Sequence, residues 1–460
     1  MLSDRRTFRE RIGFVIAGAA AGLVLLGLAG AGRHGPGAEK GVISTDGTGR
    51  VELEVPVDPN APSLIVVSVL NEMEGPWPIE VRARASASVV AMRPRTSEGV
   101  RPTRPVSEGL TLASYSDHQR EVPAPERAFH VLTGPDADRA TSYRTVAATA
   151  LASGRFVDVY ADSSDAGEDH RPLADDIVRT LEGVVLPACD RWIGRPGDVD
   201  RDGRFVVLLS SRLAGVSSAE APVLGFVRPA DFDVAMPGPF SNHCDMLYLD
   251  PQLKPGPDAH AILAHEYAHA TLAGRKLAPL GSDRSRDGEE PWLDEALAHV
   301  VESRLGFSDA NYAHRVVAFR RAPERSPLVG DAPASEGPSH APGRRGAGLS
   351  FLSFCVDRCG ADVVARLFAT KERGVAAVEA ATGEPFSRLF GEWALTMARG
   401  GTGRHGETIT TDGPPARWVA TGTTFHAVPL TATTAGLARV EVIGPPDVSL
   451  RVSIVAAARP

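Results

Sequence analysis

The sequence predicts an α+β fold in which a central α+β domain lies between two small β units. Two helices support this prediction, since an alanine-rich apolar stretch covers residues 259–273 and a second helix is expected to begin near Leu293. Alternating or apolar runs broken by Pro and Gly occur before and after these helices, which is typical of strands. A length of 460 residues also suffices for several domains of roughly 150 residues each.

The amino-terminal residues predict export. Several arginines from Arg5 onward precede an uncharged apolar run over residues 12–32, and Ala29 and Ala31 supply the small residues that a signal peptidase needs. The start also resembles a twin-arginine signal, and the run is long enough to span a bilayer if it is not cleaved. We therefore expect a signal peptide or membrane anchor at residues 1–32 and a secreted or otherwise extracytoplasmic protein, attached to a membrane only through an uncleaved anchor.

The remaining chain is expected to form a linker, two β units and the central domain. The predicted ranges are a linker over 33–50, a β domain over 51–125, the α+β domain over 126–410 and a C-terminal β segment over 411–460. In the first β domain we expect strands at 51–55, 64–69 and 79–85. In the central domain we expect strands at 156–160, 205–209 and 246–249, a long helix at 173–193, and helices from 349 to 398.

A metal-binding pattern lies within the first predicted helix. His265, Glu266 and His269 form an HExxH motif. At about 100° per residue, the two histidines project about 40° apart, so both imidazoles can share one metal ion while Glu266 flanks the same face. The residues therefore predict two zinc ligands and one general base, although the motif also occurs by chance on amphipathic helices.

The second helix supplies the missing ligand type. A catalytic zinc ion usually takes three protein ligands and leaves a fourth position to water, so the HExxH motif alone is incomplete. Glu295 offers a carboxylate, with Glu302 about 20° and His299 about 40° from it around the helix. This polar stripe fits a metal site, and it also fits a solvated helix face.

The motif His265–His269 followed by Trp292–Glu302 resembles the gluzincin metallopeptidases, whose second helix opens with Trp-Leu-x-Glu. Segments within 197–251 and 311–329 are similar to the hyicolysin-type branch, and the resemblance covers roughly residues 155–400. It implies a zincin-like metallopeptidase domain acting on protein or peptide substrates. It further implies that the strand at 246–249 forms the edge of the sheet beside the cleft.

Residue roles follow from the resemblance. It implies His265, His269 and Glu295 as zinc ligands and Glu266 as the base. Asp294 and Glu302 are expected to accept hydrogen bonds from the ligand imidazoles, because a metal-bound histidine usually donates its other N–H group.

The chain departs from that branch at one stretch. Where the branch has Tyr-Gly-Ala-x-Tyr-Leu, this chain has residues 345–350, so tyrosines that could stabilise an oxyanion are absent. The sequence leaves that role unassigned among Tyr267, Tyr312, His314 and His340. A catalytically inactive, peptidase-like surface protein that serves as a binding or adhesion module is therefore the alternative function.

Two further features concern metals and disulfides. Asp198, Asp200 and Asp202 precede a glycine in a spacing that can wrap calcium, and it also fits an ordinary Asp-rich turn. The four cysteines in a chain expected to be exported make one or two disulfides plausible. A net charge of −8 argues against nucleic acid as a partner.

Overall fold

The computed structural model describes residues 40–44, 47–73, 75–86, 125–134, 136–165, 169–215, 223–277, 288–307, 309–330, 342–403, 406 and 408–456. The chain divides into two units after Lys40, and, apart from Lys40 itself, the features below belong to the second, Gly41–Pro460. The predicted signal peptide or anchor, residues 1–32, lies outside the described residues. Among the helices that are described, none combines the length and apolar character needed to cross a membrane.

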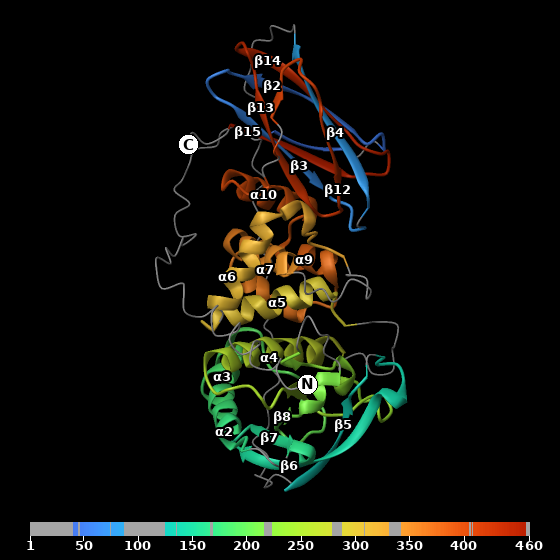
Figure 1. The fold of residues 1–460 in the computed structure, drawn as a ribbon, viewed down its shortest axis with the longest axis vertical. Helices are drawn as coiled ribbons and strands as arrows, with labels where there is room; N and C mark the ends of the chain where they lie inside the picture. Colours follow the sequence, from blue (N-terminus) through green and yellow to red (C-terminus); the bar gives the residue numbers. More distant parts are fainter. Residues whose placement is uncertain are drawn as a thin grey trace, which may run out of the picture. The chain divides into compact units, whose positions relative to one another are not determined.

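A six-stranded mixed sheet forms the base of the central domain (Figure 1). Its spatial order is β5 (Glu126–Leu132), β6 (Tyr143–Ser153), β7 (Val157–Asp162), β8 (Phe205–Leu209), β10 (Met246–Leu249) and β9 (Gly225–Phe226). Strands β7, β8 and β10 run parallel, and the others are antiparallel to their neighbours. The strands predicted at 205–209 and 246–249 are confirmed, because both are apolar runs buried on both sheet faces.

The edge of this sheet is β9 rather than β10. Tyr248 and Leu249 of β10 pair with Phe226 and Gly225 of β9, while the other side of β10 pairs with β8. The expectation that residues 246–249 form the edge was therefore wrong. Two residues are too short a run to show strand periodicity in the sequence.

The helix predicted over 173–193 is confirmed with an interruption. It consists of α2 (Arg171–Thr180), a π-helical turn (Leu181–Val185) and α3 (Leu186–Trp192). Pro187 has no N–H group, so the regular bond to the carbonyl four residues earlier is lost there. The N–H of Leu186 instead donates to the carbonyl of Leu181, which widens the helix by one residue.

Among the described residues, the helices that follow β10 complete the central domain. They are α4 (Pro257–Leu277), α5 (Pro291–Arg304), α6 (Asp309–Arg321), α7 (Pro342–Cys359), α8 (Asp362–Ala369), α9 (Gly374–Thr382) and α10 (Phe386–Arg399). Helix α4 packs on the sheet, where Tyr267 meets Phe205 edge-on with ring centroids 5.2 Å apart. Helix α5 packs on α4, and α7 packs on both α5 and α6. Trp292 and Leu293 belong to the same buried core as α4, as expected for residues that fix α5 against it.

The two β segments are not separate units. Strands β1 (Lys40–Ser44), β2 (Arg50–Val57), β3 (Ser63–Val69) and β4 (Trp77–Ser86) come from one segment. Strands β11 (Ile409–Thr410), β12 (Ala416–Ala420), β13 (Phe425–Thr431), β14 (Gly436–Ile443) and β15 (Leu450–Ala456) come from the other. They alternate in two sheets, β1-β15-β3-β13-β11 and β12-β4-β14-β2, which enclose one apolar core. Figure 1 shows blue and red strands interleaved in this sandwich. A separate N-terminal β domain and C-terminal appendage were therefore the wrong division.

The expected disulfides are not formed. Cys189, Cys244 and Cys355 are buried free thiols, and Cys359 is a half-buried one. Cys189 and Cys244 lie on separate elements, α3 and the chain before β10. Cys355 and Cys359 lie one turn apart on α7, where Cβ atoms are about 5–6 Å apart rather than the roughly 3.8 Å of a disulfide.

Candidate metal centre

Helices α4 and α5 bring the two predicted ligand histidines and Glu295 together. The Nε2 atoms of His265 and His269 are 3.1 Å apart, and His265 Nε2 is 3.4 Å from Glu295 Oε2. Ligands about 2.0–2.2 Å from a tetrahedral zinc ion lie about 3.3–3.6 Å from one another. Each of these two distances is close to that spacing, but the ligand atoms that lie within 4.8 Å of one another belong to His265, Glu295 and His299, and His269 is not in this group.

The carboxylate of Glu295 has one oxygen available for a metal. Its Oε1 accepts a hydrogen bond from Arg345 Nη2 at 2.8 Å, whereas its Oε2 is buried and has no hydrogen-bond partner. Leaving a buried carboxylate oxygen unbonded is costly, and a cation in front of it removes that cost. Burial acts to raise the pKa of Glu295, but the charge of Arg345 and the two imidazoles hold it well below the usual range. Glu295 is thus an ionised carboxylate with one oxygen directed at His265.

Each predicted ligand imidazole has a carboxylate behind it. His269 Nδ1 lies 2.6 Å from Asp294 Oδ1, and His265 Nδ1 lies 3.4 Å from Glu302 Oε2. An acceptor at Nδ1 favours the tautomer with its proton there, which leaves the Nε2 lone pair for a metal. Burial lowers the pKa of His269, but the charge of Asp294 and its hydrogen bond outweigh burial and raise the pKa to about 10. The charge of Asp294 thus stabilises the protonated form of His269.

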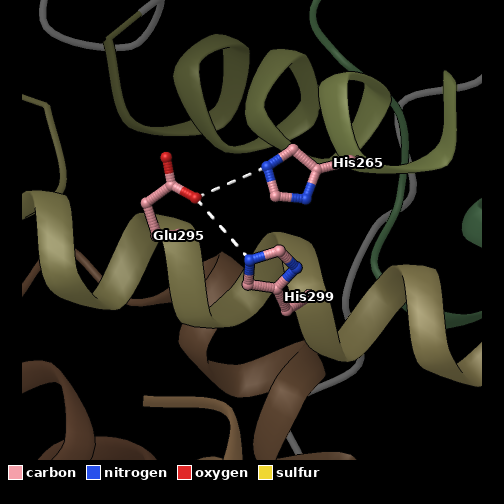
Figure 2. A group of neighbouring side chains, drawn as sticks. All are labelled: His265, Glu295 and His299. Atoms are coloured by element: carbon pink, nitrogen blue, oxygen red, sulfur yellow. Dashed lines mark ion pairs between the residues drawn. The ribbon is translucent and has the colours of Figure 1, made fainter. Parts of the chain in front are cut away.

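His299 offers a different third nitrogen. Its ring groups with His265 and Glu295 as a set of metal-ligand types, and Figure 2 shows Glu295 facing both rings. However, His299 Nε2 is 3.9 Å from Glu295 Oε2 and also contacts the guanidinium of Arg315, while its Nδ1 lies 2.9 Å from Glu302 Oε2. The lone pair that a metal needs is therefore shared with a permanently charged donor. His269 as the second imidazole ligand stays a prediction.

Glu302 connects these rings. Its Oε2 faces both His265 Nδ1 and His299 Nδ1, and it is almost fully buried. Burial would raise its pKa, but the hydrogen bonds from the two imidazoles lower the pKa to about 2. Glu302 is thus an ionised acceptor that can orient His265.

Glu266 stands in the cleft beside the predicted ligands. It is 8% exposed and lines the same cleft as His265, His269 and Glu295. Burial raises its pKa, and the charge of Glu295 adds to this effect, while the two histidines oppose it. A carboxylate with a raised pKa can both take and return a proton.

The cleft encloses about 1550 Å³ and is bordered by the edge of the sheet. Gly225 and Phe226 of β9 form one wall, and Phe307, His314 and Arg315 lie on the side of α5 and α6. A side chain at Gly225 would meet Glu266 Cγ at 3.2 Å, so the backbone of β9 approaches the predicted base closely. An extended peptide could pair with this strand edge.

The residues considered for stabilising an oxyanion differ in whether they reach the cleft. Tyr267 is 1% exposed and packs into the core against Phe205, so it faces away from the cleft. His314 is exposed and lines the cleft. The side chain of Tyr312 and all of His340 lie outside the described residues. Arg345, which no sequence pattern singled out as a site residue, lines the cleft beside Glu295.

The aspartate loop forms a second acidic group. Asp198 and Asp200 converge with Asp245 rather than with Asp202, whose carboxylate accepts from the N–H of Arg204 at 2.8 Å. Arg127 Nη2 donates a hydrogen bond to Asp200 at 2.9 Å, so one positive charge already lies beside these carboxylates. Calcium at this loop stays a prediction.

Part of the chain is similar to a known metalloprotease. Over 138 residues it is 30% identical to the neutral metalloprotease ShpI of Staphylococcus hyicus, a match that covers 28% of this chain and 30% of that protein. No family model matches the chain. The similarity indicates a distant relationship to metalloproteases, and the chain spans less than a third of that relative's length.

Proposed function

We propose that this protein is an exported zinc-dependent metalloendopeptidase of gluzincin type, from the hyicolysin-type branch, that hydrolyses peptide bonds in protein or peptide substrates. The observation that supports this most is the buried Oε2 of Glu295, which has no hydrogen-bond partner and lies 3.4 Å from His265 Nε2. The distant similarity to a neutral metalloprotease supports the same conclusion. Export rests on the basic and apolar residues before Arg33.

The chain's own residues have definite parts in this chemistry. A bound zinc ion would acidify a water molecule and polarise the substrate carbonyl. Glu266 would take a proton from the attacking water and return it to the leaving amine. Asp294 and Glu302 would hold the imidazole planes of His269 and His265, and the edge of β9 would align an extended substrate.

The decisive experiment is Glu266→Gln, assayed for both zinc content and hydrolysis of a broad peptide library. We expect about one zinc ion per chain in both proteins and a loss of hydrolysis of about 10²- to 10⁴-fold in the variant, because the amide cannot carry the proton. Asp258→Asn is the matched control, since Asp258 is exposed in the first turn of the same helix and lines the same cleft. Equal cleavage by the wild type and Glu266→Gln would contradict the proposed role. If the wild type binds zinc and cleaves nothing, the surface-protein alternative is the better conclusion.

A further inference from the structure

The guanidinium of Arg345 donates a hydrogen bond to the predicted zinc ligand Glu295. It lies in the amino-terminal half of α7, and its Nη2 donates to Glu295 Oε1 at 2.8 Å. Both side chains are largely buried, with exposures of 11% for Arg345 and 17% for Glu295. A charged hydrogen bond with little contact with water is among the stronger kinds in proteins.

The geometry around Glu295 gives this contact a specific consequence. A carboxylate can bind a metal through one oxygen or through both, and both oxygens of an unrestrained carboxylate are equally available. Here Oε1 is occupied by Arg345, whereas Oε2 faces His265 Nε2 at 3.4 Å and has no hydrogen-bond partner. The two carboxylate oxygens of Glu295 therefore differ in their hydrogen bonding.

The sequence next to Arg345 brings the backbone of α7 close to α5 and α6. A Cβ atom on Gly346 would collide with the carbonyl oxygen of Arg315 on α6, and one on Gly348 would come within 3.0 Å of Ala296 Cβ on α5. Both glycines thus let α7 lie close against two helices. Ala296 follows Glu295 directly, so the same close packing holds Arg345 beside its partner.

We propose that Arg345 is a positioning residue that restricts Glu295 to binding zinc through the single oxygen Oε2. This role rests on the proposed zinc peptidase function. By holding Oε1, Arg345 keeps Glu295 from turning and from closing around the metal with both oxygens. With His265 and His269 as the imidazole ligands, Glu295 would then offer one oxygen and leave a fourth position to water.

The test compares wild type, Arg345→Met and Arg345→Lys. Methionine keeps much of the length of the side chain and removes its donors, whereas lysine keeps the charge and compact N–H donors. We expect Arg345→Met to weaken zinc binding by about 10- to 100-fold in competition with a chelator, and Arg345→Lys to recover part of the loss.

Cobalt substitution supplies a readout that a merely structural role would not change. Four-coordinate cobalt absorbs visible light several times more strongly than five-coordinate cobalt. We therefore expect the cobalt-loaded Arg345→Met protein to have a weaker visible band than the cobalt-loaded wild type. Arg358→Met is the control, because Arg358 also lies on α7 and pairs with a carboxylate, Glu392 at 3.0 Å, outside the cleft.

The outcomes separate the two proposals. If the wild type binds no zinc, the proposed peptidase function fails. If the wild type binds zinc, while Arg345→Met has the same zinc affinity and the same cobalt spectrum, the positioning role of Arg345 is wrong and the peptidase function stands. Loss of zinc from Arg345→Met with no recovery in Arg345→Lys, and with a lowered melting temperature, would also contradict the positioning role.

Discussion

At the scale of single residues, the orientation of the predicted ligand rings depends on two carboxylates. Asp294 precedes Glu295 on α5 and reaches His269, whereas Glu302, two turns further on, reaches His265. Helix α5 thus carries the predicted ligand Glu295 together with a carboxylate partner for each of the two imidazoles. A small rotation of α5 would disturb all three groups together.

Asp294→Asn and Glu302→Gln should each weaken zinc binding by about 10- to 100-fold, because an amide is a poorer acceptor for the imidazole N–H than a carboxylate. Chelator competition measures the effect. Asp258→Asn should leave the affinity unchanged, since Asp258 is exposed in the first turn of α4. Unchanged affinity in Glu302→Gln would mean that Glu302 acts only on His299.

The motif residues could be predicted because helical spacing alone puts His265, Glu266 and His269 on one face. The choice of Glu295 as third ligand needed a family resemblance and stays a prediction, because nothing in the sequence shows which residue of α5 faces α4. The contact of Arg345 with Glu295 could not be predicted, since it depends on how closely α7 approaches α5.

At the scale of elements, small residues decide how closely the helices pack. A Cβ atom at Gly346 would collide with the backbone of Arg315. No side chain therefore fits at this position between α7 and α6. Gly183 lies in the π-helical turn, and a Cβ atom added to it would point into open space. The two glycines therefore make a matched pair for testing packing.

Gly346→Ala should destabilise the protein by about 1–3 kcal/mol, because the added methyl group forces α6 and α7 apart. Gly183→Ala should be neutral or should stabilise the protein by up to about 1 kcal/mol, because alanine restricts the unfolded chain at no steric cost. Differential scanning calorimetry compares the melting temperatures. Equal melting temperatures for both variants would show that α7 can move away from α6 without loss.

The ends of β7 and β8 carry a buried carboxylate whose ionisation stabilises the sheet. Asp162 is 2% exposed and accepts hydrogen bonds from Ser164, Ser210 and Arg212. Burial would raise its pKa, but these hydrogen bonds outweigh burial and lower it. Because the folded pKa is below the unfolded value of about 3.9, the stabilisation is complete above that pH and is lost as the pH falls through the folded pKa.

Asp162→Asn should therefore lower stability at neutral pH by about 1.5–3 kcal/mol, through loss of hydrogen bonds to a charged group. The difference from wild type should shrink as the pH falls below about 4. Thermal melts at several pH values test this. Asp136→Asn is the control, because its ion pair with Arg139 is exposed and such pairs contribute at most about 1 kcal/mol. A difference between Asp162→Asn and wild type that grows in acid would contradict the ionised state.

At the scale of the whole molecule, the sandwich shows what sequence patterns leave undetermined. The strands predicted at 51–55, 64–69 and 79–85 are present as parts of β2, β3 and β4, because alternation and apolar runs are local signals. Their partners are more than 300 residues away, and alternation says nothing about which strand pairs with which. The central domain is thus inserted between two halves of one sandwich.

Removing residues 408–460 should unfold the sandwich rather than leave an independent amino-terminal β domain. In the described sheets no strand of the first segment pairs with another strand of that segment, because β2 pairs with β14, β4 with β12 and β14, and β3 with β13 and β15. Truncation therefore removes every partner of β2, β3 and β4 and exposes unpaired strand edges, which favours aggregation.

Limited proteolysis with mass spectrometry tests the truncated protein. Residues 47–86 should be cut rapidly in the truncated chain and slowly in the full chain, and a separately added polypeptide of residues 408–460 should restore part of the protection. The loss of protection should also extend to the central domain. The N–H of Val329 donates to Thr423 Oγ1, and Phe425 packs against Trp393 with ring centroids 5.6 Å apart. A truncated protein in which residues 47–86 stay protected and soluble would show that the first segment folds alone, contrary to the pairing seen here.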